Sequence, residues 1–307
     1  MNKIKLIAFF IVIIPLFITC KKDKEDNNDE TVDYIIDHNC TDLAKIPMDY
    51  ILKARDLKIA YWYGHGGEQI IGGMNGLIEF KGVMFDYSDH LEDSLLYIYS
   101  HHLEGVNSLT NPNPEAWDTA TRNFLDTNTT INVVVWTWDG QVNDLTSVDI
   151  NKYLNAMNNL EKDYPNVKFV YFTDRLDGTG LTDNLFMRND QIRNYCKENK
   201  KFLYDFADIE SYDPDGNYYG DKLADYVCNY DADGDGILET VPPSEENNWQ
   251  ILPDDGDKNW AIDWQESHMQ DVYWYDCYSG QSQALNANQK AYAAWWLWAR
   301  LAGWDGK

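Results

Sequence analysis

The apolar run Ile131–Trp138 constrains the fold of this chain more than any other stretch. It is rich in the β-branched and aromatic residues that are typical of strands. It lacks the regular alternation of a strand that has one face in water, so we expect both of its faces to be covered. Strands of this kind occur in parallel sheets that have helices packed on both sides.

Strand-like and helix-like segments alternate on either side of this run. The further predicted strands are 59–63, 167–172 and 201–206. The predicted helices are 40–55, one that opens at 68–71, 115–125, 148–164, 184–199 and 287–301. Such alternation predicts an α/β fold, a parallel sheet with helices on both faces. The segment 74–102 fits neither pattern, and we interpret it as an insertion near the site.

Polar residues follow three of these strands. The turn Gly64–Gly67, with His65 in it, leads into Glu68 after the first strand. Asp139 and Gln141 follow the second strand, and Asp174 and Arg175 follow the third. Because parallel strands end at the same edge of a sheet, we expect these side chains to lie close together there. The structural alternative for the first segment is an ordinary turn between a strand and a helix.

The amino terminus has the pattern of a targeting segment. Lys3 and Lys5 precede the apolar run Leu6–Ile18, which is too short to span a bilayer and ends just before Cys20. We therefore expect a lipoprotein signal over 1–20 and lipid on Cys20. The next residues, 21–39, predict a disordered acidic linker. Residues 40–307 are expected to form one domain, with an acidic insertion at about 212–250.

An acidic stretch directly after a lipidated cysteine resembles the surface-export signal of Bacteroidetes lipoproteins. That resemblance implies an outer-membrane protein that faces outward. The formal net charge of −26 excludes nucleic acid as a partner, because phosphates would be repelled. In an oxidising compartment the four cysteines after Cys20 predict disulfides. Three pairings are possible, and Cys228–Cys277 with Cys40–Cys196 is the one we prefer.

The acidic insertion contains a calcium-loop pattern. Asp231, Asp233, Asp235 and Glu239 occupy the first, third, fifth and ninth positions, and a turning glycine, Gly236, occupies the sixth. The twelfth position is proline instead of glutamate, so the pattern is incomplete, and Glu245 or Glu246 is a candidate for the missing ligand. We expect a structural Ca2+ site here; the alternative is a solvated acidic turn.

Several longer motifs resemble a group of bacterial lipoproteins within the SGNH/GDSL hydrolase superfamily. They are LKIAY…GM, NVVVWTWDGQV, FVYFTDRLDGTG, LYDFADIESYDPDG, NWAIDWQ and SQALNANQKAYAAWWLWARLAGW. The resemblance runs from about Cys40 to Trp304 and implies an SGNH-hydrolase-like, flavodoxin-like fold. Enzymes of this superfamily use a serine after the first strand and a histidine near the carboxyl terminus. Here no serine lies between Leu57 and Leu77, and Gln281 stands where the histidine is expected.

The replaced loops carry carboxylates instead of a serine triad. Carboxylates that share a crevice can divide acid and base roles, which glycosidic-bond cleavage requires. Our candidate catalytic residues are Glu68, Asp139, Asp174 and His65. Our candidate substrate-binding residues are Arg175, for a uronate or sulfate, with Trp138, Gln141 and Gln281. The expected function is polysaccharide or oligosaccharide hydrolysis. The alternatives are a non-catalytic glycan-binding relative and an esterase with an unrecognised serine.

Overall fold

The computed structural model describes residues 34–307 except 93, 102, 104, 112 and 247–249, and it leaves the side chain of His65 undescribed. The expected signal segment, Cys20 and most of the expected linker therefore lie outside the described residues. Within the described part of the chain, no helix combines the length and the apolar character needed to cross a membrane.

A seven-stranded sheet forms the centre of the fold, and every neighbouring pair of its strands is parallel. The strand order is β1-β7-β6-β5-β2-β4-β3. The strands are β1 (Ile35–Ile36), β2 (Lys58–Trp62), β3 (Tyr87–Ser88), β4 (Leu96–Tyr99), β5 (Val133–Trp136), β6 (Lys168–Phe172) and β7 (Leu203–Tyr204). In β5 all four residues are buried, as expected for a strand covered on both faces. The predicted parallel α/β architecture is confirmed.

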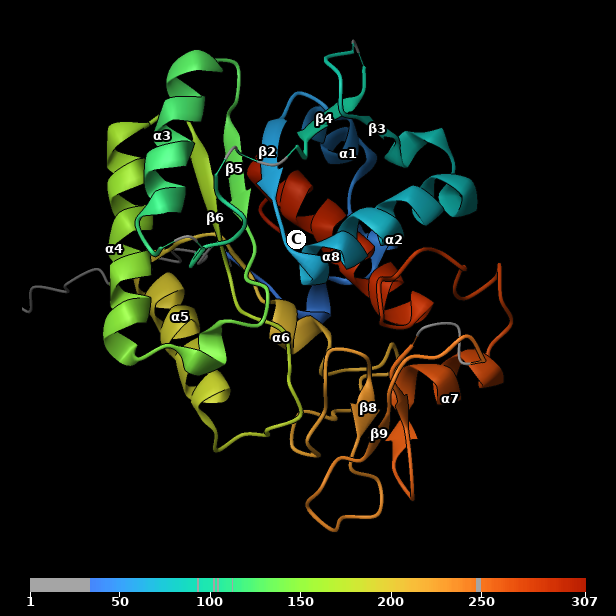
Figure 1. Ribbon diagram of the computed structural model, residues 1–307. Helices are drawn as coiled ribbons and strands as arrows, with labels where there is room; N and C mark the ends of the chain where they lie inside the picture. Colours follow the sequence, from blue (N-terminus) through green and yellow to red (C-terminus); the bar gives the residue numbers. More distant parts are fainter. Residues whose placement is uncertain (1–33, 93, 102, 104, 112, 247–249) are drawn as a thin grey trace, which may run out of the picture. The chain divides into compact units, whose positions relative to one another are not determined.

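Helices cover both faces of this sheet (Figure 1). One face carries α3 (Ala116–Thr127), α4 (Ser147–Asp163) and α5 (Asn184–Asn199), and the other carries α1 (Met48–Ala54), α2 (His65–Lys81) and α8 (Ala284–Leu301). Helix α8 is buried along almost its whole length, because it packs against α1 and α2 as well as the sheet. Short 3-10 helices at 38–40, 43–45, 83–85 and 142–144 and the single turn α6 (Phe206–Ile209) complete this part of the fold.

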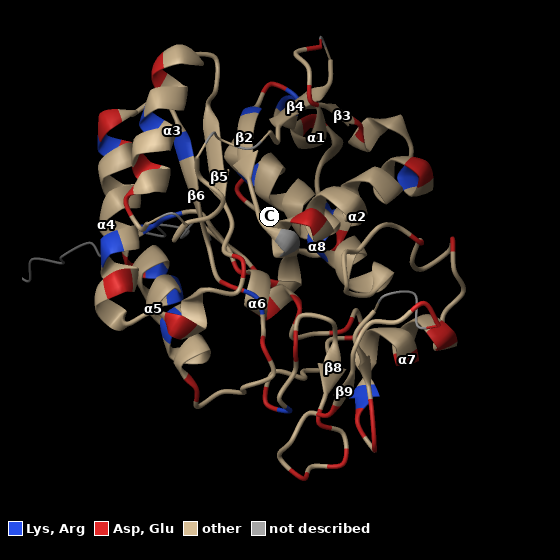
Figure 2. Cartoon of the chain, in the orientation of Figure 1, with Lys and Arg blue, Asp and Glu red and all other residues tan. Residues whose placement is uncertain are grey.

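Residues 211–283 form a loop-rich region beside the carboxyl ends of the strands. Its regular elements are β8 (Asn229–Tyr230), β9 (Thr240–Val241), β10 (Leu252–Pro253), β11 (Lys258–Asn259) and α7 (Trp260–Ser267). A small apolar cluster of its own holds it together: Cys228, Trp260, Ala261 and Trp264, closed by Leu285 of α8. Figure 2 shows acidic residues gathered in its loops around β8 and β9.

Three predictions are corrected by the structure. The described end of the expected linker is not disordered, because β1 pairs with β7 at the edge of the sheet. The supposed insertion 74–102 contains β4, in which Leu96 and Ile98 are buried and the two tyrosines between and after them are half-buried. The expected disulfides are not formed, since no two of Cys40, Cys196, Cys228 and Cys277 are joined. Each thiol lies in its own surroundings; Cys228, for example, faces Ser282 Oγ at 3.8 Å.

Candidate functional site

Asp139 lies at the amino-terminal end of α2. Gly64 is the residue before this helix, and a Cβ atom on it would lie 2.2 Å from Cγ of Asp139. The glycine therefore makes room for the carboxylate at the positive end of the helix dipole, where a negative charge is favoured. Gln141 closes the turn around Gly140: its Oε1 accepts from the Asp139 N–H at 2.9 Å and its Nε2 donates to the Asp139 carbonyl at 3.1 Å.

Asp174 is held in a cradle of backbone amides. Its Oδ1 accepts from the N–H groups of Gly140 and Arg175, and its Oδ2 from that of Val142, each at 2.9 Å. Burial raises the pKa of Asp174 to about 6, and the three N–H bonds offset only part of that rise. This carboxylate, 1% exposed, joins the loop after β5 to the end of β6. It is not among the described residues that line the pockets found in this structure, whereas the catalytic prediction requires it to face a crevice.

Trp138 belongs to the core, in contrast to its predicted role in substrate binding. It is 4% exposed, and its indole N–H donates to the carbonyl of Phe172 at 3.0 Å. Its ring packs edge-on against Tyr153 of α4. No face of this ring is open to a sugar.

Three predicted residues do meet in one pocket of about 270 Å³, which we call the Arg175 pocket. They are Glu68 from the first turn of α2, Arg175 after β6, and Gln281 before α8. The described residues that line this pocket are Glu68, Gln69, Arg175, Tyr226, Pro243, Tyr278, Gly280 and Gln281. The pocket therefore lies at the carboxyl edge of the sheet, where the start of α2, the loop after β6 and the segment before α8 converge.

The Arg175 guanidinium lies over an aromatic ring. Its Cζ is 4.0 Å from the centre of the Tyr226 ring, and a Cβ on Gly140 would approach Nη2 to 3.1 Å. Among the residues that the structure describes, no carboxylate forms an ion pair with it. Two hydrogen bonds fix the surrounding wall: the Tyr226 hydroxyl donates to Gln281 Oε1 at 3.0 Å, and the Tyr278 hydroxyl donates to Glu68 Oε2 at 3.1 Å.

A buried ion pair supports the pocket from below. Lys290 Nζ donates to Gln69 Oε1 and to Glu210 Oε2, the latter at 2.7 Å, and both charged side chains are fully buried. Burial lowers the pKa of Lys290 and raises that of Glu210, while their mutual attraction opposes both changes. Glu210 also accepts from the N–H of Leu176. The lysine charge is thus neutralised inside the fold and is not offered to a ligand.

Two of the four predicted calcium ligands, Asp231 and Asp233, lie in one acidic cluster, whereas Asp235 and Glu239 are not part of it. Carboxylate oxygens of Asp231, Asp233 and Asp257 lie within 4.8 Å of one another. Gly236 has a φ of 87°, the left-handed turn that the pattern requires. Burial and the charge of Asp235 raise the pKa of Glu239. Asp257 was not predicted, because it lies far along the chain from the loop and no local spacing connects the two.

Sequence reasoning also missed Tyr226 and Tyr278, because both lie in irregular segments without a periodic pattern. The signal that pointed to them was indirect, the excess of 21 tyrosines in the chain. The chain matches no protein-family model and no curated protein.

Proposed function

We propose that this protein binds an acidic glycan, with a uronate or sulfate group of the glycan on Arg175. The observation that carries this proposal is the guanidinium stacked on Tyr226, half-buried in a pocket and without an ion pair to any described carboxylate. Arg122 and Arg193 are each paired with described aspartates, whereas Arg175 lies in a pocket without such a pair. Guanidinium groups bind carboxylate and sulfate oxygens through two parallel hydrogen bonds.

The other walls of the pocket suit a sugar ring. The ring of Tyr278 is 65% exposed at the rim, and aromatic faces of this kind pack against the C–H surface of a sugar. Gln281 and Glu68 offer polar atoms to hydroxyl groups, which both donate and accept. The Glu68 charge also disfavours a second acidic group nearby, so the proposal is for a glycan whose acidic groups are spaced apart.

Hydrolysis is the second candidate. Glycoside hydrolases need two carboxyl groups about 5–10 Å apart across the scissile bond. Of the three predicted carboxylates, Glu68 lines the Arg175 pocket, whereas Asp174 is enclosed and Asp139 is not among the described residues that line it. No serine occurs among the described lining residues either, which gives the esterase alternative no support. For these reasons we favour glycan binding over glycan hydrolysis as the function.

The SGNH-type lipoprotein resemblance supplies the rest of this proposal. We propose that lipid on Cys20 anchors the protein to the outer membrane, with the domain facing outward. A glycan-binding protein in that place would hold extracellular polysaccharide for a degrading system.

Isothermal titration calorimetry tests the binding proposal, with oligogalacturonate, sulfated oligosaccharides and their neutral counterparts as ligands. We expect an acidic ligand to bind and Arg175→Gln to weaken binding by at least roughly tenfold, as expected for the loss of a charged hydrogen bond. Tyr278→Ala should also weaken binding. Tyr273→Ala is the matched control, because Tyr273 is similarly exposed at 60% but does not line this pocket.

Equal affinity of the wild type and Arg175→Gln would contradict the proposal. Release of new reducing ends from a bound glycan would instead support hydrolysis, and Glu68→Gln should then abolish that release.

We also propose a structural calcium site formed by Asp231, Asp233 and Asp257 with the loop around Gly236. Oxygen ligands from several carboxylates are what Ca2+ prefers, and binding only to the folded state stabilises it, by about 2.7 kcal/mol at a concentration of 100 times Kd. Calcium should therefore raise the melting temperature of the wild type, and Asp257→Asn should remove most of that rise. Asp255→Asn is the control, since Asp255 is exposed and its φ of 46° suits asparagine. Identical melting curves with calcium and with chelator would leave this cluster as an acidic turn.

A further inference from the structure

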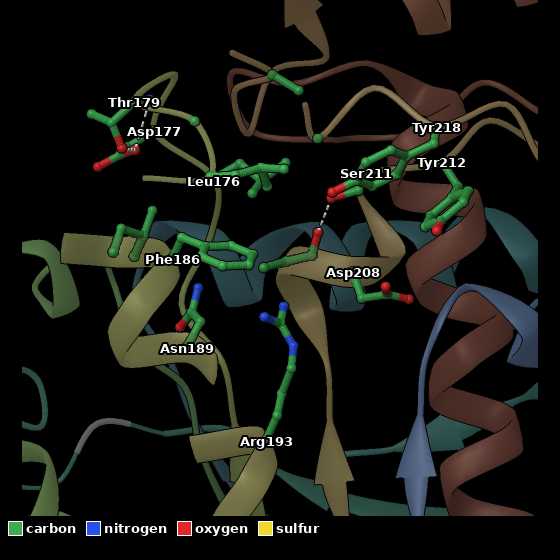
Figure 3. A pocket seen from close by; sticks show the side chains of 16 residues that line it. Leu176, Asp177, Thr179, Phe186, Asn189, Arg193, Asp208, Ser211, Tyr212 and Tyr218 are labelled. Atoms are coloured by element: carbon green, nitrogen blue, oxygen red, sulfur yellow. Dashed lines mark hydrogen bonds between the residues drawn. The ribbon is translucent and has the colours of Figure 1, made fainter. Parts of the chain in front are cut away.

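The segment that carries Arg175 continues as the wall of a second cavity, of about 240 Å³, which we call the Arg193 cavity. Leu176 lies on one side of it, residues of α5 and α6 lie below, and Tyr212 and Tyr218 lie on the other side (Figure 3). Leu181 also lines it. None of its described lining residues is shared with the Arg175 pocket. It is therefore a separate site.

The floor of this cavity presents a hydrogen-bond donor. Arg193 is fixed by Asp205, to which its Nε and Nη2 donate at 2.5 and 2.9 Å. Among the described residues nothing accepts a hydrogen bond from Nη1. Figure 3 shows the guanidinium pointing into the space between Phe186 and Asp208. The neighbouring Asn189 offers nothing to a ligand, because both ends of its amide bond to the backbone of Asp174.

Asp208 lines the cavity on the side of Tyr212. Its Oδ2 receives both the backbone N–H of His38 at 2.9 Å and the ring Nδ1 of His38 at 2.6 Å. The imidazole is itself stacked on Tyr212, with ring centres 3.6 Å apart. These contacts fix the carboxylate toward His38, so Arg193 Nη1 is the polar group that the floor of the cavity offers to a ligand.

The remaining walls are apolar or aromatic. Phe186 is 36% exposed and Tyr218 37% exposed, so each has one face in the cavity mouth and one in the fold. The volume is below the range of about 300–1,000 Å³ that is usual for drug-sized ligands. A ligand that fits is therefore small, about one ring in size, with an apolar face and a polar edge.

The charges around the cavity disfavour an anion. Asp205 neutralises Arg193, while the carboxylates of Asp208 and Asp177 line the same space without a second arginine or lysine among the described lining residues. A neutral ligand avoids the repulsion that an acidic one would meet. This distinguishes the Arg193 cavity from the Arg175 pocket, where no carboxylate of the described part of the chain forms an ion pair with the guanidinium.

We propose that the Arg193 cavity binds one neutral sugar ring, through a hydroxyl group on Arg193 Nη1 and through packing of the sugar ring on Phe186. A hydroxyl oxygen accepts the hydrogen bond that Nη1 donates. The C–H face of the ring covers the phenyl group. This site is independent of the function proposed for Arg175.

Saturation-transfer NMR on the full chain tests the proposal, with glucose, galactose, mannose and fucose as probes and galacturonate as the acidic comparison. At least one neutral sugar should receive saturation and show a measurable Kd. Phe186→Ala should raise that Kd roughly threefold to tenfold, the range expected for a lost ring contact. Met187→Ala is the matched control: it is the next residue of α5 and 47% exposed, but it does not line the cavity.

A second variant guards against an indirect effect of the first. Leu181→Trp places a large ring at the rim of the cavity, where Leu181 is 38% exposed, and should abolish binding while the melting temperature stays close to that of the wild type. The bound neutral sugar should also remain when galacturonate is added in excess, since the two sites are distinct. No saturation of any neutral sugar, an unchanged Kd in Phe186→Ala, or displacement by galacturonate would each overturn the proposal.

Discussion

Asp174 and Arg175 are neighbours in sequence with opposite surroundings. The carboxylate turns inward and accepts three backbone N–H groups, whereas the guanidinium turns outward onto the ring of Tyr226. At the end of β6, Asp174 thus connects the neighbouring loops through its hydrogen bonds, and Arg175 reaches the Arg175 pocket. The position of Arg175 depends on Asp174, because the carboxylate holds the N–H of Arg175 itself.

Replacing Asp174 by asparagine tests this interpretation. The amide keeps the shape but points an NH2 group at a backbone N–H donor, which leaves buried donors unpaired. We expect a loss of about 1–3 kcal/mol in the free energy of unfolding at neutral pH, measured by urea denaturation. Asp144→Asn, at an exposed position two residues after Val142, should change stability by less than about 0.5 kcal/mol. Equal stability of the two variants would show that the cradle is dispensable.

Helix α2 uses glycines to bring the backbone of other segments close to it. A Cβ on Gly73 would lie 2.1 Å from the carbonyl oxygen of Ala287 in α8, and one on Gly72 would lie 1.9 Å from that of Tyr278. Both obstacles are backbone atoms, which cannot move aside as a flexible side chain can. The contact with Tyr278 also sets the rim of the Arg175 pocket. The glycines that lower helix propensity here are therefore required for packing.

Two alanine substitutions on this one helix should have opposite outcomes. Gly73→Ala should destabilise the fold by about 1–3 kcal/mol through overpacking against α8. Gly66→Ala has room, since its nearest contact would be 3.7 Å away on Phe206, and the alanine should be neutral or stabilise the fold by up to about 1 kcal/mol. Thermal melts of the pair measure the difference. Similar melting temperatures would mean that α2 and α8 can separate without loss.

The sequence predicted most elements of the sheet and less of the site. Buried strands such as β5 are apolar throughout, and α5 has the bounds that its pattern indicated, 184–199. Strand β4, which lies between β2 and β3, was missed because it is short and mixes tyrosines with apolar residues. Glu68, Arg175 and Gln281 share a pocket because chain order places them at one sheet edge. The direction in which Asp174 points depends on distant backbone amides, which no local pattern records.

At the scale of the whole molecule, buried carboxyl groups and the net negative charge together determine how stability depends on pH. Asp225, directly before Tyr226, is 6% exposed. Burial raises its pKa to about 7; the charge of Glu210 adds to this rise, and N–H bonds from Asn229 and Val227 oppose it. Its pKa in the unfolded chain is about 3.9. The folded state therefore binds the proton more tightly, and this contribution to stability is complete below about pH 4 and is lost as the pH rises through about 7.

Stability should accordingly fall between about pH 4 and pH 7. Repulsion within a chain of net charge −26 lowers stability in the same direction. Asp225→Asn removes one titrating group and leaves the remaining repulsion nearly unchanged. Its melting temperature should therefore depend less steeply on pH than that of the wild type. Parallel curves for the two proteins would show that Asp225 is already ionised in the fold at pH 5.

The unjoined cysteines have a consequence for where this fold can be assembled. Thiolates are the reactive form of cysteine, and burial raises the pKa of the Cys277 thiol to about 12 and those of Cys196 and Cys228 well above their usual value. These thiols are therefore slow to oxidise, and no covalent cross-link holds the described domain together. We therefore expect this domain to fold under reducing and under oxidising conditions alike, without an oxidase or a disulfide isomerase.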